Sequence, residues 1–465
     1  MECSIVIPCY DQVALTRGCV HSLHQQHGGT PAEIVLVDNG SREDFASLHD
    51  PARGVRVLRL PHNRGFAGGA NAGIAAARHP VVVVMNNDTL AARNLLLELA
   101  HVHRRHREAG AIAPVSNLVK GAAQIPVTED TRDPAARERL AASLATAPLA
   151  HDATTLSGLC LWLPREVLDR VGGFDERFGH GNFEDDDFCL RLRLHGYRLL
   201  LARRAFLHHE GHATFRSLGL DLDAELRRRR RQFEAKWAGD PAGRATVAAL
   251  GDDVLAAEAA AADARAAWPL WPDTHWHLGR GAMQRGDFTL AASHFRQLLQ
   301  HCPQHVEARL AQAACLLRGE NPDAGAASLA ALADEPLSPP QEAFLREHLG
   351  EHHYRRGDAA AAEREFRRVL TLHPDPSGKL RNWHGVALAQ AGRLDEAVVT
   401  LRAAAAAGLG SASTNLGLCH LLRGDTAAAG AAFAAALQRS PADAVARHHY
   451  DALEPRSVPR AATTA

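Results

Sequence analysis

The stretch PVVVVMNNDT at residues 80–89 decides the fold class, because five consecutive apolar residues lead directly into a polar cluster. A strand that is apolar on both faces is typical of a parallel sheet covered by helices on each side. Helix-like stretches at residues 12–26 and 69–78 alternate with further short apolar runs at 4–7, 33–37 and 55–58. Strands that alternate with helices predict βαβ units, so we expect an α/β domain with a mostly parallel sheet.

Polar residues follow the ends of three of these strands, namely Tyr10 and Asp11, Asp38 and Asn39, and the cluster Asn86-Asn87-Asp88. In open α/β sheets, ligands bind beyond the carboxyl ends of the strands. We therefore expect the functional site at this edge of the sheet.

The second half of the chain carries a helical repeat. Glycines recur at Gly286, Gly319, Gly357, Gly392 and Gly424. A second series of helix breakers runs in phase with them, at Pro303, Pro336, Pro374, Gly408 and Pro441. Each unit reads as helix, glycine turn, helix and breaker, and a period of about 34 residues is typical of tetratricopeptide repeats. The alternative interpretation is an irregular, alanine-rich helical bundle.

These two patterns divide the chain, which is longer than one hydrophobic core usually organises. We place the α/β domain at residues 1–240, a helical linker at 241–270 and about five repeats, forming an all-α solenoid, at 271–450. The last segment, 451–465, has few residues that build a core, and we expect it to be disordered.

Composition describes an ordinary soluble protein, with 46% hydrophobic and 23% charged residues. The 52 basic residues nearly balance the 53 acidic ones, which gives no indication of nucleic-acid binding. We find neither a signal peptide nor an apolar stretch long enough to span a bilayer. The eight cysteines form no CxxC pair and are interpreted as reduced thiols of a cytoplasmic protein.

Five motifs occur in order in the first half: SIVIPCYDQ (4–12), VDNGS (37–41), NRGFAGGANAGI (63–74), MNNDT (85–89) and GGFDERFGHGNFEDDDFCLRLRLHGY (172–197). Together they resemble the family 2 glycosyltransferases, which are inverting enzymes of the Rossmann-like GT-A fold, and in particular their rhamnosyltransferase-like branch. The resemblance covers roughly residues 3–215. It implies transfer of a hexosyl or rhamnosyl unit from a UDP- or dTDP-sugar. The usual Asp-x-Asp metal motif of the fold is reduced here to Asn86-Asn87-Asp88.

The resemblance also implies a divalent cation, Mg²⁺ or Mn²⁺, which would neutralise the charge on the departing diphosphate. Asp88 follows its strand directly and is the expected ligand. His209, within AFLHHEGHATF (205–215), is implied as a second ligand or a diphosphate contact. The alternative for His209 is an ordinary packing or surface histidine, because the chain has 28 histidines.

Four consecutive carboxylates, Glu184-Asp185-Asp186-Asp187, stand at the start of a predicted helix. Inversion needs one carboxylate that takes the proton of the attacking hydroxyl. The ED-x-D pattern of the family places this base at Asp185, with Glu184 as the second candidate and Asp187 in a capping or organising role. Helix capping without catalysis is the alternative interpretation of the run.

The remaining family motifs imply a nucleotide-sugar site. Asp38 would bind the nucleoside, although an Asx turn explains the same residue. Arg64 would reach the diphosphate from a glycine-rich loop of low steric bulk. The other residues that we assign to this site are Pro8, Tyr10, Asn63, Gly69, Asn71, Asn87 and Gly173.

Two other classes of function remain open. One is a repeat scaffold that binds nucleotide sugar without turnover and recruits partner proteins. The other is a nucleotidyltransferase, which lacks support because no glycine-rich loop with a basic residue follows the first strand. For the enzyme, the acceptor would be a glycan, a lipid-linked glycan or a protein, and the repeat groove would hold the acceptor or a partner protein. The basic run 227–231 also suggests peripheral contact with the inner face of the membrane.

Overall fold

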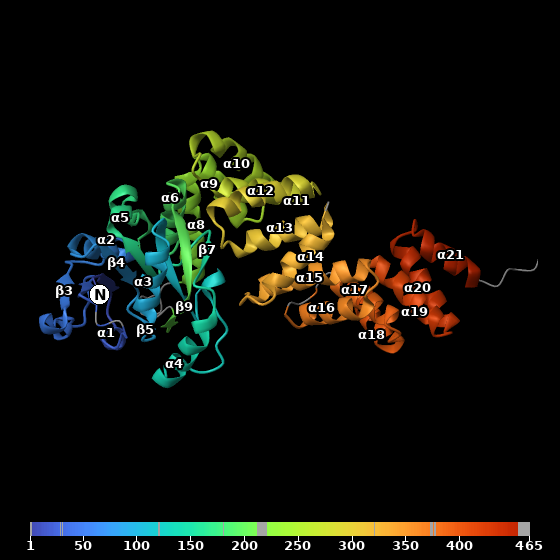
Figure 1. Ribbon diagram of the computed structural model, residues 1–465, viewed down its shortest axis with the longest axis horizontal. Helices are drawn as coiled ribbons and strands as arrows, with labels where there is room; N and C mark the ends of the chain where they lie inside the picture. The colour runs from blue at the N-terminus through green and yellow to red at the C-terminus, as the bar shows by residue number, and fades with distance from the viewer. Residues whose placement is uncertain are drawn as a thin grey trace, which may run out of the picture. The chain divides into compact units, whose positions relative to one another are not determined.

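We analysed a computed structural model of the chain, which describes residues 2–27, 29, 31–119, 121–179, 181–211, 221–319, 321–372, 375 and 378–453. The residues fall into two compact units, 1–315 and 316–465. Figure 1 shows the α/β sheet, drawn from blue to green, within the first unit. The predicted linker boundaries at 240 and 270 both lie inside the first unit. The boundary between the two compact units, after residue 315, is therefore closer to the C-terminus than the sequence pattern indicated.

The first unit contains a nine-stranded mixed sheet with the order β3-β2-β1-β4-β8-β6-β9-β5, and β7 also pairs with β9. The strands are β1 (Ser4–Cys9), β2 (Glu33–Asp38), β3 (Val55–Arg59), β4 (Val81–Met85), β5 (Thr89–Ala91), β6 (Ala109–Ser116), β7 (Ala150–Ala153), β8 (Cys160–Pro164) and β9 (Arg198–His209). β3, β2, β1 and β4 are parallel, as predicted. β8 runs antiparallel to β4 and β6, while β6 and β9 are parallel, so the sheet is mixed beyond β4.

Helices cover both faces of this sheet and confirm the predicted α/β class. They are α1 (Val13–Leu23), α2 (Gly65–Ala76), α3 (Leu95–Arg105), α4 (Pro134–Ser143), α5 (Arg165–Val171) and α6 (Glu184–Leu194). Alternate residues of β4 enter opposite cores: Val82 and Val84 pack with α2, whereas Val83 and Met85 pack with α3. A strand buried on both faces explains the uninterrupted apolar run that marked it in the sequence.

Further helices complete the first unit: α8 (Leu222–Trp237), α9 (Pro241–Leu250), α10 (Val254–Ala267), α11 (Asp273–Gln284), α12 (Phe288–His301) and the start of α13 (Val306–Arg318). Phe178 and Leu194 of the α/β domain share a core cluster with Phe233, Ala261 and Trp271 from this helical segment. The segment that we predicted as a linker is therefore packed against the α/β domain.

The second unit consists of helix hairpins: α14 (Pro322–Leu332), α15 (Pro339–Arg355), α16 (Ala359–Leu372), α17 (Lys379–Gln390), α18 (Leu394–Ala406), α19 (Gly410–Leu422), α20 (Thr426–Arg439) and α21 (Ala444–Leu453). A glycine in the first helix of a hairpin faces a phenylalanine sixteen positions later, as at Gly350–Phe366 and Gly417–Phe433. A Cβ on either glycine would lie within 2.7 Å of the ring. The repeated small residue thus permits close approach of the two helices.

The predicted disordered tail begins at residue 451, but α21 continues to Leu453. The rest of that tail, residues 454–465, lies outside the described residues. Within the described part of the chain, no helix is both long enough and apolar enough to cross a bilayer.

Candidate active site

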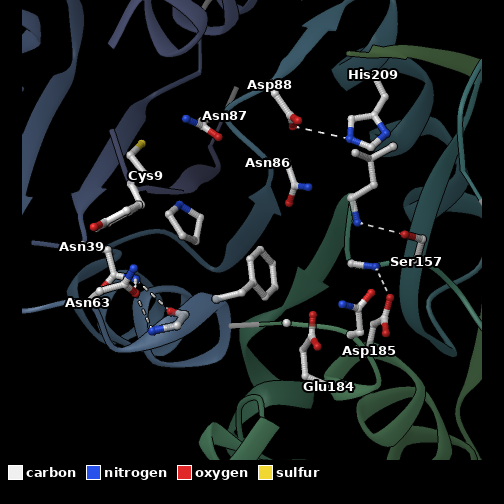
Figure 2. Close-up of a pocket in the computed structure, with 18 residues that line it drawn as sticks. Cys9, Asn39, Asn63, Asn86, Asn87, Asp88, Ser157, Glu184, Asp185 and His209 are labelled. Carbon is white, nitrogen blue, oxygen red and sulfur yellow. Dashed lines mark hydrogen bonds and ion pairs between the residues drawn. The ribbon is translucent and has the colours of Figure 1, made fainter. Parts of the chain in front are cut away.

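A cavity of about 200 Å³ lies at the carboxyl ends of β1 and β4, where the sequence predicted a site (Figure 2). Its lining comes from seven segments that are distant in the sequence: Pro8, Cys9, Tyr10; Asn39; Asn63, Gly65, Phe66; Asn86, Asn87, Asp88; Ser157, Gly158, Leu159; Gly181, Asn182, Glu184, Asp185; and His209. Eight predicted site residues line it: Pro8, Tyr10, Asn63, Asn87, Asp88, Glu184, Asp185 and His209. The predicted residues Asp38, Arg64, Gly69, Asn71 and Gly173 are not among the lining residues.

One wall is the N-terminus of α6. The two residues before it, Asn182 and Phe183, have positive φ angles of 72° and 68°. Such backbone is uncommon for residues other than glycine and is concentrated at functional sites. Asp185 Oδ2 accepts a hydrogen bond of 2.9 Å from the backbone N–H of Gly158. This bond fixes the carboxylate at the cavity wall (Figure 2).

Glu184 lines the same wall but differs in environment from Asp185. Its side chain is buried, and its Oε2 has no hydrogen-bond partner within the described part of the chain. Burial, followed by the negative charge of Asp185, raises the pKa of the Glu184 carboxyl well above its usual value. We infer that Glu184 favours the neutral form, in which its O–H is a hydrogen-bond donor.

This burial leads to a prediction about stability. The pKa of Glu184 in the folded protein lies above 4.5, its value in the unfolded chain. Protonation of Glu184 therefore contributes to the free energy of unfolding. This contribution is complete below pH 4.5 and is lost as the pH rises through the folded pKa. Glu184→Gln is neutral at every pH. We expect its Tm to exceed that of the wild type at pH 7, and the difference to shrink as pH falls toward 4.5. Equal Tm values from pH 4.5 to 8 would contradict a buried, strained carboxyl.

Asp187 points away from the cavity and is fully buried. It accepts hydrogen bonds from Trp237 Nε1 at 3.0 Å and Arg191 Nε at 2.9 Å, and it pairs with Lys236. Trp237 and Lys236 lie on α8, so their contacts with Asp187 join α6 to α8 and give Asp187 an organising role in the fold.

Asp88 and His209 form the opposite wall. The antiparallel register of β5 and β9 pairs Thr89 with His209 and so brings the imidazole to Asp88. His209 Nε2 lies 3.5 Å from Asp88 Oδ1 (Figure 2). Burial lowers the pKa of His209, but the hydrogen bond and charge of Asp88 outweigh burial and raise it above the usual value.

The other ring nitrogen of His209 decides what can lie between these two side chains. Nδ1 is 2.7 Å from the carbonyl oxygen of Leu118, which only accepts, so Nδ1 carries a proton. In a neutral ring, Nε2 of His209 is then a hydrogen-bond acceptor. It faces the carboxylate of Asp88, which also only accepts, so the two groups require a cation between them. The pair therefore fits either a proton or a divalent cation. Among the described residues, no group of three or more acidic, histidine or cysteine side chains gathers around a potential metal position.

A third wall is built around Asn39. Its amide donates to Asn63 Oδ1 at 3.1 Å and to the Gly65 carbonyl at 2.9 Å, and its oxygen accepts from the Arg64 N–H at 2.9 Å. The neighbouring Asp38 is buried, accepts from the Ser41 N–H at 2.9 Å and pairs with Arg59. The Asp38 carboxylate thus closes the turn 38–41, a role that is compatible with the predicted nucleoside contact, which stays a prediction, and its neighbour Asn39 lines the cavity.

The other predicted residues that do not line the cavity support its walls. Asn71 donates to the Phe174 carbonyl at 2.8 Å and accepts from the Phe174 N–H at 2.9 Å, which ties α2 to the 172–176 segment. A Cβ on Gly173 would overlap Asn71, and one on Gly69 would lie 3.2 Å from Asn39. Arg64 forms an ion pair of 2.8 Å with Glu176, and both side chains are well exposed to solvent.

Sequence reasoning missed part of the lining, in particular Phe66 and the segment 157–159. Phe66 lies inside the quoted NRGF motif but was not singled out. The segment Ser157-Gly158-Leu159 precedes β8, and its alternation of small and apolar residues carries no chemical signal. Only the tertiary contact between Gly158 and Asp185 reveals its role.

Comparisons with known proteins found similarities for both halves of the chain. Residues 4–172 match the glycosyl transferase family 2 model, and residues 277–342, 348–412 and 400–444 match a tetratricopeptide repeat model. The chain thus contains a family 2 glycosyltransferase domain followed by tetratricopeptide repeats, as predicted. The finer assignment to the rhamnosyltransferase-like branch stays a prediction.

Two curated relatives and one solved structure illustrate the similarity. The uncharacterized protein y4gI of Sinorhizobium fredii is 28% identical over 224 residues, 45% of this chain and 24% of that protein. The pre-mycofactocin glycosyltransferase of Mycobacterium tuberculosis (strain H37Rv) is 28% identical over 223 residues, 46% of this chain and 44% of that protein. The alignments thus span less than half of these relatives. The structure of GalNAc-T7 with UDP, GalNAc and Mn2+ is 17% identical, with a TM-score of 0.37, over 45% of this chain and 43% of that chain.

Proposed function

We propose that the protein transfers a hexosyl or rhamnosyl unit from a UDP- or dTDP-sugar to an acceptor hydroxyl, with inversion and with Asp185 as the general base. One observation carries this proposal: Asp185 and the Asp88–His209 pair lie on opposite walls of one cavity (Figure 2). An in-line displacement needs this separation, because the base acts on one face of the anomeric carbon and the diphosphate departs from the other.

On the leaving-group side, Asp88 and His209 would hold a divalent cation, which supplies a Lewis acid that neutralises charge on the diphosphate. One carboxylate and one imidazole leave further coordination positions for diphosphate oxygens and water, as is usual for Mg²⁺ sites. The amide cluster of Asn39 and Asn63, together with Pro8 and Tyr10, would form the floor for the nucleoside.

On the acceptor side, Asp185 takes the proton of the attacking hydroxyl. The new bond forms between this oxygen and the anomeric carbon as the bond from that carbon to the diphosphate oxygen breaks. The N–H of Gly158 holds Oδ2 of Asp185 in place, and the backbone N–H of Asp186 donates to Oδ1 at 3.0 Å. Both bonds orient the base before the acceptor arrives.

The proposal includes a cytoplasmic location, where nucleotide sugars are made, and an acceptor that is a glycan, a lipid-linked glycan or a protein. A partner protein in the tetratricopeptide groove and peripheral membrane contact belong to the same proposal. The competing function is a scaffold that binds nucleotide sugar without turnover.

A panel of nucleotide sugars tests both the donor and the metal. We expect one UDP- or dTDP-sugar with Mn²⁺ to stabilise the fold by ~2.7 kcal/mol at about 100 times its Kd. Excess chelator should remove most of this stabilisation, and Asp88→Asn should do the same without chelator. The same donor should slowly release nucleoside diphosphate. Donor binding without any release, with or without acceptors, would favour the scaffold, and full activity in chelator would exclude the metal site.

A further inference from the structure

A second and larger cavity, of about 560 Å³, adjoins the first one within the same compact unit. The two cavities share Ser157, Asn182, Asp185 and His209 in their linings. The side of Asp185 that faces away from the donor therefore opens into this second space. Its volume lies within the range of small-molecule sites.

The far wall of this cavity comes from the first helical repeat and the start of the second one. Trp276 of α11, together with His305 and Glu307 at the start of α13, lines it opposite the segment 154–157 of the glycosyltransferase domain. The wall is fixed in place, because the Gln304 N–H donates to Asp152 Oδ2 at 2.8 Å and the Asp152 N–H donates to the Gln304 carbonyl at 3.1 Å.

A buried ion pair provides a second attachment. Arg193 of α6 is fully buried, and its Nε donates to Asp273 Oδ2 of α11 at 3.0 Å. The first repeat is therefore an integral part of the same body as the active site and not an independent module.

The chemistry of the lining indicates a class of ligand. Trp276 stacks on His305, with ring centroids 5.3 Å apart and an interplanar angle of 30°, and its ring also lies 5.7 Å from that of Phe295. The Arg280 guanidinium also lies over the ring, 5.9 Å from its centroid, and the part of the ring that lines the cavity offers apolar surface to a ligand. The carboxylates of Asp186 and Glu307 and the hydroxyls of Thr154 and Thr155 surround it.

His305 is a buried member of the same wall, with a side chain that is only 2% exposed. Its Nδ1 lies 3.3 Å from Glu307 Oε2 and 3.3 Å from the Ala308 nitrogen. Its ring stacks on Trp276. His305 therefore holds Trp276 and Glu307 in place at the cavity wall.

We propose that this second cavity is the acceptor site, that its ligand is a carbohydrate without a phosphate near the reacting hydroxyl, and that the first repeat forms one wall through Trp276. The inference rests on the proposed function and names the substrate class of the same site. A carbohydrate presents C–H groups to the ring and hydroxyls to the polar rim. The carboxylates of Asp185, Asp186 and Glu307 repel a phosphorylated acceptor.

The test uses the full chain, the donor that stabilises it most, and p-nitrophenyl glycosides of neutral sugars as acceptors. Donor hydrolysis is measured as nucleoside diphosphate released without acceptor, and transfer is measured as glycosylated product. We expect Trp276→Ala to lower the ratio of transfer to hydrolysis at least 10-fold, and Trp276→Phe to lower it less. Trp383→Ala is the matched control, because the ring of Trp383 also lies 5.7 Å from a phenylalanine ring, that of Phe366, but Trp383 belongs to the second unit. It should leave the ratio unchanged.

A charge reversal provides an independent variant in case Trp276→Ala fails to fold. Glu307→Lys should raise transfer to a glycoside 6-phosphate at least 5-fold relative to the neutral glycoside. Absence of nucleoside diphosphate release by the wild type with every donor would overturn the proposed function itself. Normal release with an unchanged ratio in Trp276→Ala would overturn only the acceptor site. Transfer to peptides but to no glycoside would overturn the carbohydrate class.

Discussion

Replacement of Asp185 by asparagine should lower the turnover of sugar transfer by about 10²–10⁴-fold, which is the usual contribution of a general base. Asparagine keeps the size of the side chain and an oxygen that accepts the Gly158 N–H, but it cannot take a proton from the acceptor. We therefore expect the Tm and the donor affinity of Asp185→Asn to stay close to the wild-type values. Turnover, Tm and calorimetric donor binding are measured on the same preparation.

Neighbouring carboxylates provide the controls for this experiment. Asp187→Asn should lower Tm more than turnover, because it weakens the contacts with Lys236 and Trp237 that join α6 to α8. Near-normal turnover in Asp185→Asn together with an inactive Glu184→Gln would move the base one residue earlier. Normal turnover in both Asp185→Asn and Glu184→Gln would show that the acidic residues 184–187 cap the helix and take no part in catalysis.

The fold and much of the site were predictable because their signals are local. A strand buried on both faces leaves an uninterrupted apolar run, and β1, β2 and β4 contain such runs. The edge strand β3 was located from the shorter pattern VRVL, although it is only partly buried. Polar residues that follow those strands must gather at one edge of a parallel sheet. For this reason Tyr10, Asn39 and Asp88 were expected at this edge of the sheet, and all three line the cavity.

The rest of the site depends on contacts that no local pattern encodes. Asp38 and Asn39 are adjacent and both polar, but the former turns inward to Arg59 and the latter lines the cavity. Asn71 matches the family motif, but no local pattern shows that its amide binds the backbone of Phe174, and its predicted ligand contact stays a prediction. The lining segment 157–159 was missed because its role comes from a hydrogen bond to Asp185 across 27 positions of sequence.

The repeat pattern likewise did not encode the contacts between helices that are distant in the sequence. Its period predicted the helices of the second half, but it treated the first repeat like the others. The structure assigns α11 and α12 to the unit that contains the sheet. Arg193 and Asp273 join the sheet domain to the first repeat within this unit. They are 80 positions apart, and in the sequence each looks like an ordinary surface charge.

This ion pair leads to the second large expected effect. Arg193→Met should lower the free energy needed to open α11 from the glycosyltransferase domain by about 3–5 kcal/mol, because it leaves Asp273 buried without its counter-charge. Burial raises the pKa of Asp273, but the charge and hydrogen bonds of Arg193 outweigh burial and hold that pKa below its usual value. Hydrogen exchange of the α11 amides in the native full chain measures this opening, with the amides of α17 as an internal reference from the second unit.

The second partner of Asp273 determines the design of the compensating variant. Trp271 Nε1 donates to Asp273 Oδ2 at 3.1 Å, so removal of the whole carboxyl group would leave a buried indole N–H without an acceptor. Asp273→Asn removes the charge and keeps the acceptor. The double variant Arg193→Met with Asp273→Asn should therefore recover most of the protection of the α11 amides that the single variant Arg193→Met loses. Equal protection in the wild type and Arg193→Met would show that the hydrophobic cluster around Trp271 holds the first repeat in place without the ion pair.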